Sequence, residues 1–412
     1  MITIKPFRGY RPKEGLESRI ACKPYDVLSH EEALHIGKDN PFSFVHVIRP
    51  EIDMNEDINP YSDEVYAMAG KNLQGFIDNG YLIEENANVF YIYRQILNGR
   101  EQNGIVGCIS IDDYGENRIK KHEFTRIDKE EDRIKHFYAS QANTEPVFLF
   151  YKKNEELSKF IEDWTSNNQP VYDFASKDGV KQILWVVDDE ERIHYIQDIF
   201  KEIDCLYIAD GHHRTASSYK VGLRMRKEKL DYTGKEEFNY FMSVVFPGDE
   251  LYIMPYNRIV KDLNGNSEEE FIEKVSISFD ITPLKSLREP LVKNEFTMAF
   301  KDKYYKIVPK KGIINTTGEI DSLDASILQN NILAPILGID DPRTNDRIEF
   351  LGGEDMFEII TKRLSNDMKV AFLLYPTQIN EITAVSDLNK VMPPKSTWFE
   401  PKLMSGLFVH KF

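Results

Sequence analysis

The sequence has little cysteine, no long hydrophobic run and fewer basic than acidic residues. Its three cysteines, Cys22, Cys108 and Cys205, are widely spaced among 412 residues and form neither a metal motif nor a disulfide framework, as in proteins of a reducing cytoplasm. The longest apolar runs, such as residues 370–375, have the length of a core strand and are too short for a membrane span. The first residues contain no apolar signal-peptide segment. We therefore expect a cytoplasmic protein that has no membrane partner.

Acidic residues outnumber basic ones, with 68 Asp and Glu against 52 Lys and Arg and a formal net charge of −16. Proteins that bind nucleic acid usually carry a basic face, so the charge argues against a nucleic-acid partner. The sequence contains neither a Walker phosphate loop nor a Gly-x-Gly-x-x-Gly segment, and therefore neither standard nucleotide fold is indicated. A local basic pocket for a small anion remains compatible with the composition.

Apolar periodicity predicts helices and strands in alternation, and thus a mixed α+β fold. Helices are expected at residues 29–36, 61–79, 128–136, 155–165, 190–200, 212 onward, 268–274 and 322–332. Strands are expected at residues 43–48, 89–96, 104–112, 147–151, 183–187, 206–209, 240–246, 251–254, 296–300 and 304–308. The character of the expected helices and strands changes near the loop 264–267, which predicts two domains. Residues 1–264 form the N-terminal and central domain with the ligand site, and residues 265–412 form a C-terminal α/β domain that contributes a loop to it.

The strongest functional signal follows the expected strand at residues 206–209. Asp210 and Gly211 predict a turn, and His212, His213 and Arg214 open a helix. The unpaired N–H groups and the dipole of a helix start suit an oxyanion such as phosphate. A cation in the first turn opposes the helix dipole, whereas a guanidinium matches phosphate oxygens, so Arg214 points to anion binding. The alternative is a plain turn followed by surface histidines.

Further segments place charged and aromatic residues in loops. Residues 7–12 carry Arg8 and Arg11 around a glycine, and residues 24–29 carry Tyr25 and Asp26. Residues 119–126 carry His122, Glu123 and Arg126 at a strand-to-helix connection, where Glu123 is a candidate base. Residues 391–402 carry Lys395 and Ser396, which suit a phosphate or carboxylate, and residues 341–347 are either a weaker site or a capped turn with a salt bridge. For the segments 7–12, 119–126 and 391–402, the alternative interpretation is that the charged residues are simply solvated on exposed loops.

A metal hydrolase is a less favoured interpretation. Its ligands would come from His122, Glu123, His136, His212 and His213, but no His-x-x-x-His or Cys-x-x-Cys spacing supports it. A zinc site would therefore depend on proximity that the sequence does not show.

Several short motifs together resemble the family catalogued as domain of unknown function 1015. They are the segments 8–12, 24–27, 121–123, 144–147, 210–214 and 394–397, which extend over nearly the whole chain. The family designation implies no activity. Independently, Asp-Gly-His-His-Arg after a strand resembles the nucleotide site of the ParB and sulfiredoxin superfamily, which includes free L-serine kinases. This resemblance implies a mixed-sheet, ParB/sulfiredoxin-like nucleotide-binding core. A histidine stands at position 212 where sulfiredoxins have a reactive cysteine, so their chemistry is not expected.

The serine kinase resemblance implies transfer of a phosphoryl group from ATP or ADP, with Mg²⁺, to a small hydroxyl substrate, L-serine being favoured. The residues expected to bind the nucleotide are Gly211, His212, His213, Arg214, Thr215, Lys395 and Ser396. The residues expected to bind the substrate are Arg8, Arg11, Tyr25, His122 and Arg126. Asp210 is the expected metal ligand and, with His213, a catalytic residue; Glu123 is the expected base, and Asp26 competes for that role. A regulatory module that binds nucleotide without turnover is the alternative.

Overall fold

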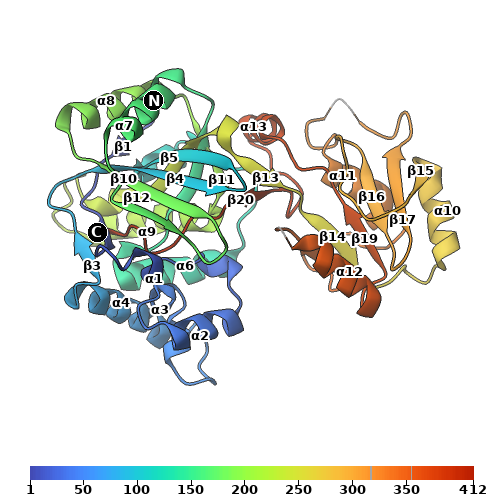
Figure 1. The fold of residues 1–412 in the computed structure, drawn as a ribbon, viewed down its shortest axis with the longest axis horizontal. Helices are drawn as coiled ribbons and strands as arrows, with labels where there is room; N and C mark the ends of the chain where they lie inside the picture. Colours follow the sequence, from blue (N-terminus) through green and yellow to red (C-terminus); the bar gives the residue numbers. More distant parts are fainter. Residues whose placement is uncertain (316–317, 354) are drawn as a thin grey trace. The chain divides into compact units, whose positions relative to one another are not determined.

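The computed structural model describes residues 1–315, 318–353 and 355–412, and the chain divides into two compact units (Figure 1). The first unit contains residues 1–121, 125–251 and 401–412, and the second contains residues 122–124 and 252–400. The chain thus enters the second unit twice, once for only three residues. The predicted boundary after residue 264 lies inside the second unit.

A mixed nine-stranded sheet forms the centre of the first unit. Its order is β6-β11-β8-β12-β5-β4-β10-β9, with β1 paired to β5. The β8–β12 and β6–β11 pairs are parallel and the others are antiparallel, so the predicted mixed α+β class is confirmed. The strands are β1 (Ile4–Lys5), β4 (Phe90–Leu97), β5 (Arg100–Ser110), β6 (Ile119–Lys120), β8 (Val147–Tyr151), β9 (Tyr172–Ala175), β10 (Lys181–Val187), β11 (Leu206–Asp210) and β12 (Tyr240–Pro247).

Helices cover both faces of this sheet. The apolar sides of α7 (Glu155–Asn167) and α8 (Glu190–Glu202) bury their side chains on one face, while α9 (His212–Glu228), α6 (Ile127–Ser140) and α4 (Asp63–Asp78) pack in sequence at the other (Figure 1). Shorter helices are α1 (Glu17–Ile20), α2 (His30–Asp39), α3 (Val45–Ile48) and α5 (Ile111–Gly115). Two small pairs, β2 (Tyr10–Pro12) with β3 (Leu82–Glu84) and β7 (Ala142–Asn143) with β21 (His410–Lys411), complete the unit.

The second unit contains a six-stranded antiparallel sheet of order β15-β17-β16-β19-β14-β18. Its strands are β14 (Asn257–Val260), β15 (Phe279–Leu284), β16 (Phe296–Ala299), β17 (Tyr304–Pro309), β18 (Ile348–Leu351) and β19 (Val370–Leu373). The helices are α10 (Glu268–Ser278), α11 (Asp324–Leu328), which continues as a π-helical turn at Gln329–Leu333, α12 (Met356–Asn366) and α13 (Ile379–Asp387). A separate pair joins β13 (Tyr252–Met254) to β20 (Trp398–Glu400).

Local sequence signals account for most of these elements. Ser29 accepts a hydrogen bond from the Glu32 amide at 3.2 Å and donates its own amide to the Glu32 carboxylate at 2.8 Å, which starts α2 with a capping box. The hairpin between β4 and β5 turns at Asn98 and Gly99, with φ of 51° and 77°. Both strands therefore extend further into the polar segment 97–103 than predicted. Within the described ranges, no helix is long and apolar enough to cross a membrane.

The predicted strand at residues 43–48 is wrong, because the segment forms the short helix α3. Its residues Val45, Val47 and Ile48 are buried, and the Phe44 amide donates to the Ile20 carbonyl at 2.9 Å. A short apolar run is compatible with a strand or a buried helical turn, and here tertiary packing overrides the β-propensity of valine and isoleucine. The predicted helix at 322–332 is shorter than expected and ends in the π-helical turn.

Candidate functional site

The Asp-Gly-His-His-Arg segment joins β11 to α9 in the first unit. Gly211 adopts φ 95° and ψ 31°, a left-handed conformation, and α9 begins at His212. The positive φ favours glycine, and a Cβ atom at position 211 would also lie 3.1 Å from Arg214 Nε, which is closer than an ordinary contact. The local geometry is therefore the strand, tight turn and helix start that the sequence predicts.

Arg214 turns back from the first turn of α9 toward the end of β11. It is 2% exposed, and its Nη2 donates to Asp210 Oδ2 at 2.7 Å while its Nη1 donates to the Pro146 carbonyl at 2.6 Å. Lys402 Nζ lies 3.8 Å from the other oxygen of Asp210. Burial disfavours the charged form of Arg214, but the carboxylates of Asp210 and Asp26 raise its pKa above the ordinary value. The guanidinium is thus a fixed internal charge rather than a mobile surface group.

Glu145 is a buried carboxylate close to Arg214. Its Oε1 accepts hydrogen bonds from the Tyr25 amide and the Ser405 hydroxyl, both at 3.0 Å. Its Oε2 lies 3.6 Å from Arg133 Nη1. Burial raises the pKa of Glu145, and the nearby charges of Arg214 and Arg133 partly offset that effect. Segments distant in the sequence therefore meet at this carboxylate.

Arg133 supplies a second buried guanidinium from α6. Its Nε donates to Asp132 Oδ2 at 3.0 Å, and its Nη2 lies 2.9 Å from the same oxygen as an ion pair. Asp132 Oδ1 accepts from the Tyr66 hydroxyl at 2.9 Å. The guanidinium carbon lies 3.8 Å from the centre of the Tyr25 ring. We call Arg133, Glu145 and Arg214 the arginine–glutamate cluster.

Each member of the arginine–glutamate cluster has one buried polar atom without a hydrogen-bond partner. These atoms are Arg133 Nη1, Glu145 Oε2 and Arg214 Nε. Such an atom costs about 1–3 kcal/mol when it is left unsatisfied, and native structures contain few of them. Arg133 Nη1 and Glu145 Oε2 face each other as an ion pair at 3.6 Å, which offsets part of this cost, whereas Arg214 Nε, beside Gly211, has no such partner. The arginine–glutamate cluster is therefore the candidate site for a polar ligand in the first unit.

Asp26 is an exposed carboxylate whose charge acts on the arginine–glutamate cluster. It follows Tyr25 in the 3-10 turn Tyr25–Val27, and its charge acts on Arg214, Glu145 and Tyr25. The structure thus brings together four sequence-predicted site residues, namely Tyr25, Asp26, Asp210 and Arg214.

The two histidines and Thr215 are engaged at the start of α9. His213 Nε2 accepts a hydrogen bond from the Arg126 amide at 3.0 Å, which ties α9 to the first residues of α6. His212 is buried, and the Thr215 hydroxyl donates to the Gly211 carbonyl at 3.0 Å. The Arg126 side chain is exposed and pairs with Asp128 at 2.7 Å. Their ligand-binding roles stay predictions.

Arg8 and Arg11 contact acidic residues around the β2–β3 pair. Arg11 forms an ion pair with Glu85 and donates to the Tyr172 hydroxyl at 3.1 Å, and Arg8 Nη2 lies 3.4 Å from Glu84. These contacts give both arginines a structural role, and their predicted role in substrate binding stays a prediction.

The remaining predicted residues lie in the second unit, where the structure groups them. The His122 carbonyl accepts from the Met392 amide at 2.8 Å, and His122 Nε2 lies 3.1 Å from the Thr397 hydroxyl. The Ser396 hydroxyl donates to the Pro393 carbonyl at 2.6 Å. The exposed Lys395 Nζ lies 5.4 Å from the centre of the Tyr256 ring. The segment with His122 and Glu123 therefore packs on the loop that carries Lys395 and Ser396.

A model of the family described as Protein of unknown function (DUF1015) matches residues 4–326. The chain belongs to this family. The predicted family membership is therefore confirmed, while no curated protein matches the chain significantly.

Solved structures resemble this DUF1015 protein only distantly. SbnI from Staphylococcus aureus, truncated at its C-terminus, is 12% identical, with a TM-score of 0.37 over 73% of this chain and 85% of its own. A free serine kinase in complex with AMP is 13% identical, with a TM-score of 0.36 over 72% and 86%. A conserved hypothetical protein from Pyrococcus furiosus is 14% identical, with a TM-score of 0.35 over 74% and 95%. Similarity at this level does not establish a shared activity.

The carboxylates of the DUF1015 protein fit Mg²⁺ only in part. Within the described residues, no group of three or more His, Cys, Asp or Glu side chains is placed to hold a metal ion. Mg²⁺ is commonly held by one or two carboxylates together with phosphate oxygens of a substrate. Asp210, at the start of α9, fits that mode, although Arg214 and Lys402 already neutralise its charge.

Sequence reasoning assigned no role to Arg133, Glu145, Lys402 and Ser405 of the DUF1015 protein. Glu145 gave a usable signal, because it lies in the motif at residues 144–147 that contributes to the family resemblance. Arg133 was hidden among the many charges of α6, and the contributions of Lys402 and Ser405 depend on the return of the chain to the first unit.

Proposed function

We propose that the first unit binds the phosphates of ATP or ADP at the start of α9 and that the protein is a kinase for a small hydroxyl substrate, with L-serine as the favoured acceptor. The observation that carries the proposal is the arginine–glutamate cluster, with its two buried guanidiniums, its three buried polar atoms that lack a hydrogen bond, and Arg214 packed beside Gly211. Phosphoryl transfer requires positioning and neutralisation of developing charge, which fixed guanidiniums and helix-start amides supply.

In this proposal the acceptor hydroxyl attacks the terminal phosphorus of the nucleotide. A new oxygen–phosphorus bond forms, the phosphoanhydride bond breaks, and the nucleotide leaves with one phosphate fewer. The amides at the start of α9 bind the phosphates, and Arg214 holds the Asp210 carboxylate beside them. Mg²⁺, held by Asp210 and the phosphates, would supply additional charge neutralisation.

The hydroxyl proton passes to a carboxylate in this proposal, and two residues compete for the role. Glu123 is the base that the motif resemblance implies, and it belongs to the second unit. Asp26 belongs to the first unit, where its charge acts on both Arg214 and Glu145. Incubating the protein with Mg²⁺, L-serine and either ATP or ADP, and measuring O-phosphoserine by mass spectrometry, tests the activity. Failure to phosphorylate serine, other amino acids or simple alcohols contradicts a kinase.

The two candidate bases are separated by matched amide variants. The variants are Asp26→Asn and Glu123→Gln. The variant that removes the true base should keep its nucleotide affinity within about threefold of the native protein and lose about 100-fold or more in kcat. Asp39→Asn, at an exposed position at the end of α2, is the control and retains full activity. Full activity in both Asp26→Asn and Glu123→Gln excludes both residues as the base.

A regulatory nucleotide-binding module without turnover is the second candidate function. The observation in its favour is that both carboxylate oxygens of Asp210 face cations, Arg214 and Lys402, which weakens this residue as a metal ligand. Calorimetric binding of nucleotide without any phosphorylated product would favour this function over the kinase.

A further inference from the structure

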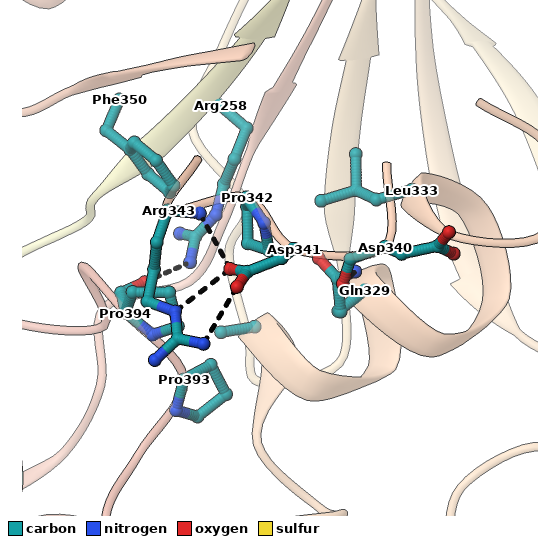
Figure 2. A pocket seen from close by; sticks show the side chains of 11 residues that line it. Arg258, Gln329, Leu333, Asp340, Asp341, Pro342, Arg343, Phe350, Pro393 and Pro394 are labelled. Atoms are coloured by element: carbon teal, nitrogen blue, oxygen red, sulfur yellow. Dashed lines mark hydrogen bonds and ion pairs between the residues drawn. The ribbon is translucent and has the colours of Figure 1, made fainter. Parts of the chain in front are cut away.

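The second unit contains a pocket of about 300 Å³ beside the sheet (Figure 2). None of the residues predicted above for the kinase site lines it, although its wall residues Pro393 and Pro394 directly precede Lys395 and Ser396. Leu333, Phe350, Pro393 and Pro394 give it apolar walls, and Arg258 of β14 contributes a guanidinium. Its volume is at the lower end of the range of small-molecule sites, and apolar walls with few polar groups are typical of them.

Arg258 is buried in an unusual way, with 4% exposure. Its Nη1 donates to the Tyr256 carbonyl, and its Nη2 lies 3.5 Å from the Pro394 carbonyl. The guanidinium carbon lies 5.3 Å from the centre of the Phe350 ring. Among the residues that the structure describes, no carboxylate lies within ion-pair distance of Arg258. Its hydrogen-bond and ring partners are thus neutral groups.

Other arginines of the second unit are paired with acids. Arg343 binds Asp341 at 2.8 Å, Arg347 binds Asp262 at 2.5 Å, and Arg363 binds Glu349 at 2.8 Å. A buried cation without a carboxylate at ion-pair distance is costly, because neutral carbonyls replace only part of its hydration and the more distant charge of Asp324 offsets only part of the effect of burial on its pKa. Burial lowers the pKa of Arg258 to about 10, so the group still carries its charge at neutral pH.

The pocket-lining segment that contains Asp340, Asp341 and Arg343 is held by polar contacts. Gln329 Nε2 donates to the Ile339 carbonyl at 2.7 Å, and Arg343 forms a two-point ion pair with Asp341. Figure 2 shows the guanidinium groups of Arg258 and Arg343 on the same side of the pocket, close to Pro394. Arg343 is exposed and paired with Asp341, and Asp340 is also exposed, so Arg258 is the one buried charged group among the pocket-lining residues that the structure describes.

We propose that this pocket binds a small organic anion. One oxyanion group, a carboxylate or a phosphate monoester, forms an ion pair with Arg258, and an apolar body contacts Phe350 and the two prolines. The guanidinium fork matches either oxyanion, and a bound ligand would replace the missing counter-ion. The nearby carboxylates of Asp340 and Asp341 disfavour polyanions, which makes a nucleotide a poor ligand for this pocket.

Titration calorimetry on the full chain with benzoate, phenyl phosphate and the uncharged isostere benzamide tests the proposal. We expect at least one of the two anions to bind at least tenfold more tightly than benzamide. The stronger anion identifies the oxyanion class. The proposal is wrong if neither anion exceeds benzamide by this factor.

Substitutions locate the binding. Arg258→Gln should weaken binding of the anion at least tenfold, while Arg363→Gln, at a paired arginine outside the pocket, should leave it unchanged. Equal affinity in a folded Arg258→Gln protein overturns the proposal. If that variant does not fold, a crystal structure of the native chain with the stronger anion decides the matter: the proposal requires the oxyanion at Arg258, and a ligand bound only elsewhere contradicts it.

Discussion

At the residue scale, Arg214 and Arg224 provide a direct measure of what burial does to an arginine. Both lie on α9 and both pair with an acid four residues away, Arg214 with Asp210 and Arg224 with Glu228. Arg214 is almost fully buried and also donates to the Pro146 carbonyl, whereas the Arg224 side chain is 53% exposed. The two positions therefore differ in environment and not in local sequence spacing.

We expect Arg214→Gln to lower the free energy of unfolding by about 3 kcal/mol, because it leaves the carboxylates of Asp210 and Glu145 without their shared cation. Arg224→Gln should cost less than about 0.5 kcal/mol, since an exposed pair contributes little. Urea unfolding of both variants gives the comparison. Equal losses would show that Arg214 is not an essential charge of the arginine–glutamate cluster.

At the element scale, the conformation of the turn between β11 and α9 predicts the effect of replacing Gly211 on stability. Gly211→Ala should destabilise the first unit by about 1–3 kcal/mol, because φ is 95° and the new Cβ would approach Arg214 Nε to 3.1 Å. Gly75→Ala is the control inside α4, where a Cβ meets no atom within 4 Å. It should stabilise by about 0.5–1 kcal/mol. Thermal unfolding that shifts in the same direction for both variants contradicts this interpretation.

A second prediction at this scale concerns the start of α11, where burial raises the pKa of Asp324 to about 7. The unfolded chain releases this proton near pH 4 and the folded chain near pH 7, so Asp324 lowers stability progressively as pH rises between those values. Above pH 7 the folded chain has also released the proton, and the loss of stability that Asp324 causes is complete. Asp324→Asn should therefore raise the stability of the second unit by about 1–3 kcal/mol at pH 8 and by little at pH 4.

Melting temperatures between pH 4 and 8 check the Asp324 prediction. Asp302→Asn, at an exposed loop position in the same unit, is the control and should leave the pH profile unchanged. A constant difference between Asp324→Asn and the native chain at all pH values would show that Asp324 is ionised throughout.

The sequence predicts individual elements better than it predicts the site. Strand β8 has the bounds that its apolar run predicts, and the turn at Gly211 has the expected geometry, because both depend on neighbouring residues. The helix α3 and the cluster of Arg133 with Glu145 depend on contacts between distant segments, which local patterns do not contain. The motifs identified residues that are able to bind or react, but which charges pair with one another can be seen only in the folded structure.

At the scale of the whole molecule, the chain leaves the first unit and returns to complete it. Residues 401–412 belong to that unit, and Val409 exchanges backbone hydrogen bonds with Tyr10 at 2.8 and 2.9 Å. Ser405 exchanges two with Cys22 at 2.9 and 3.1 Å, and its hydroxyl donates to Glu145. The first unit, and with it the arginine–glutamate cluster, therefore remains incomplete until the last dozen residues have been made.

Removal of residues 401–412 should unfold the first unit and spare the second. The segment buries five apolar side chains, Leu403, Met404, Leu407, Phe408 and Val409. Each contributes about 1.5–3 kcal/mol, which together reaches the total stability of an ordinary domain. Limited proteolysis of the shortened chain should leave a protected fragment from the region 252–400 and cleave within residues 1–121 and 125–251, which belong to the first unit. A chain that lacks only Phe412 is the control and should resist in both units, whereas equal protection of residues 1–121 and 125–251 in the shortened chain would show that the first unit folds without its final segment.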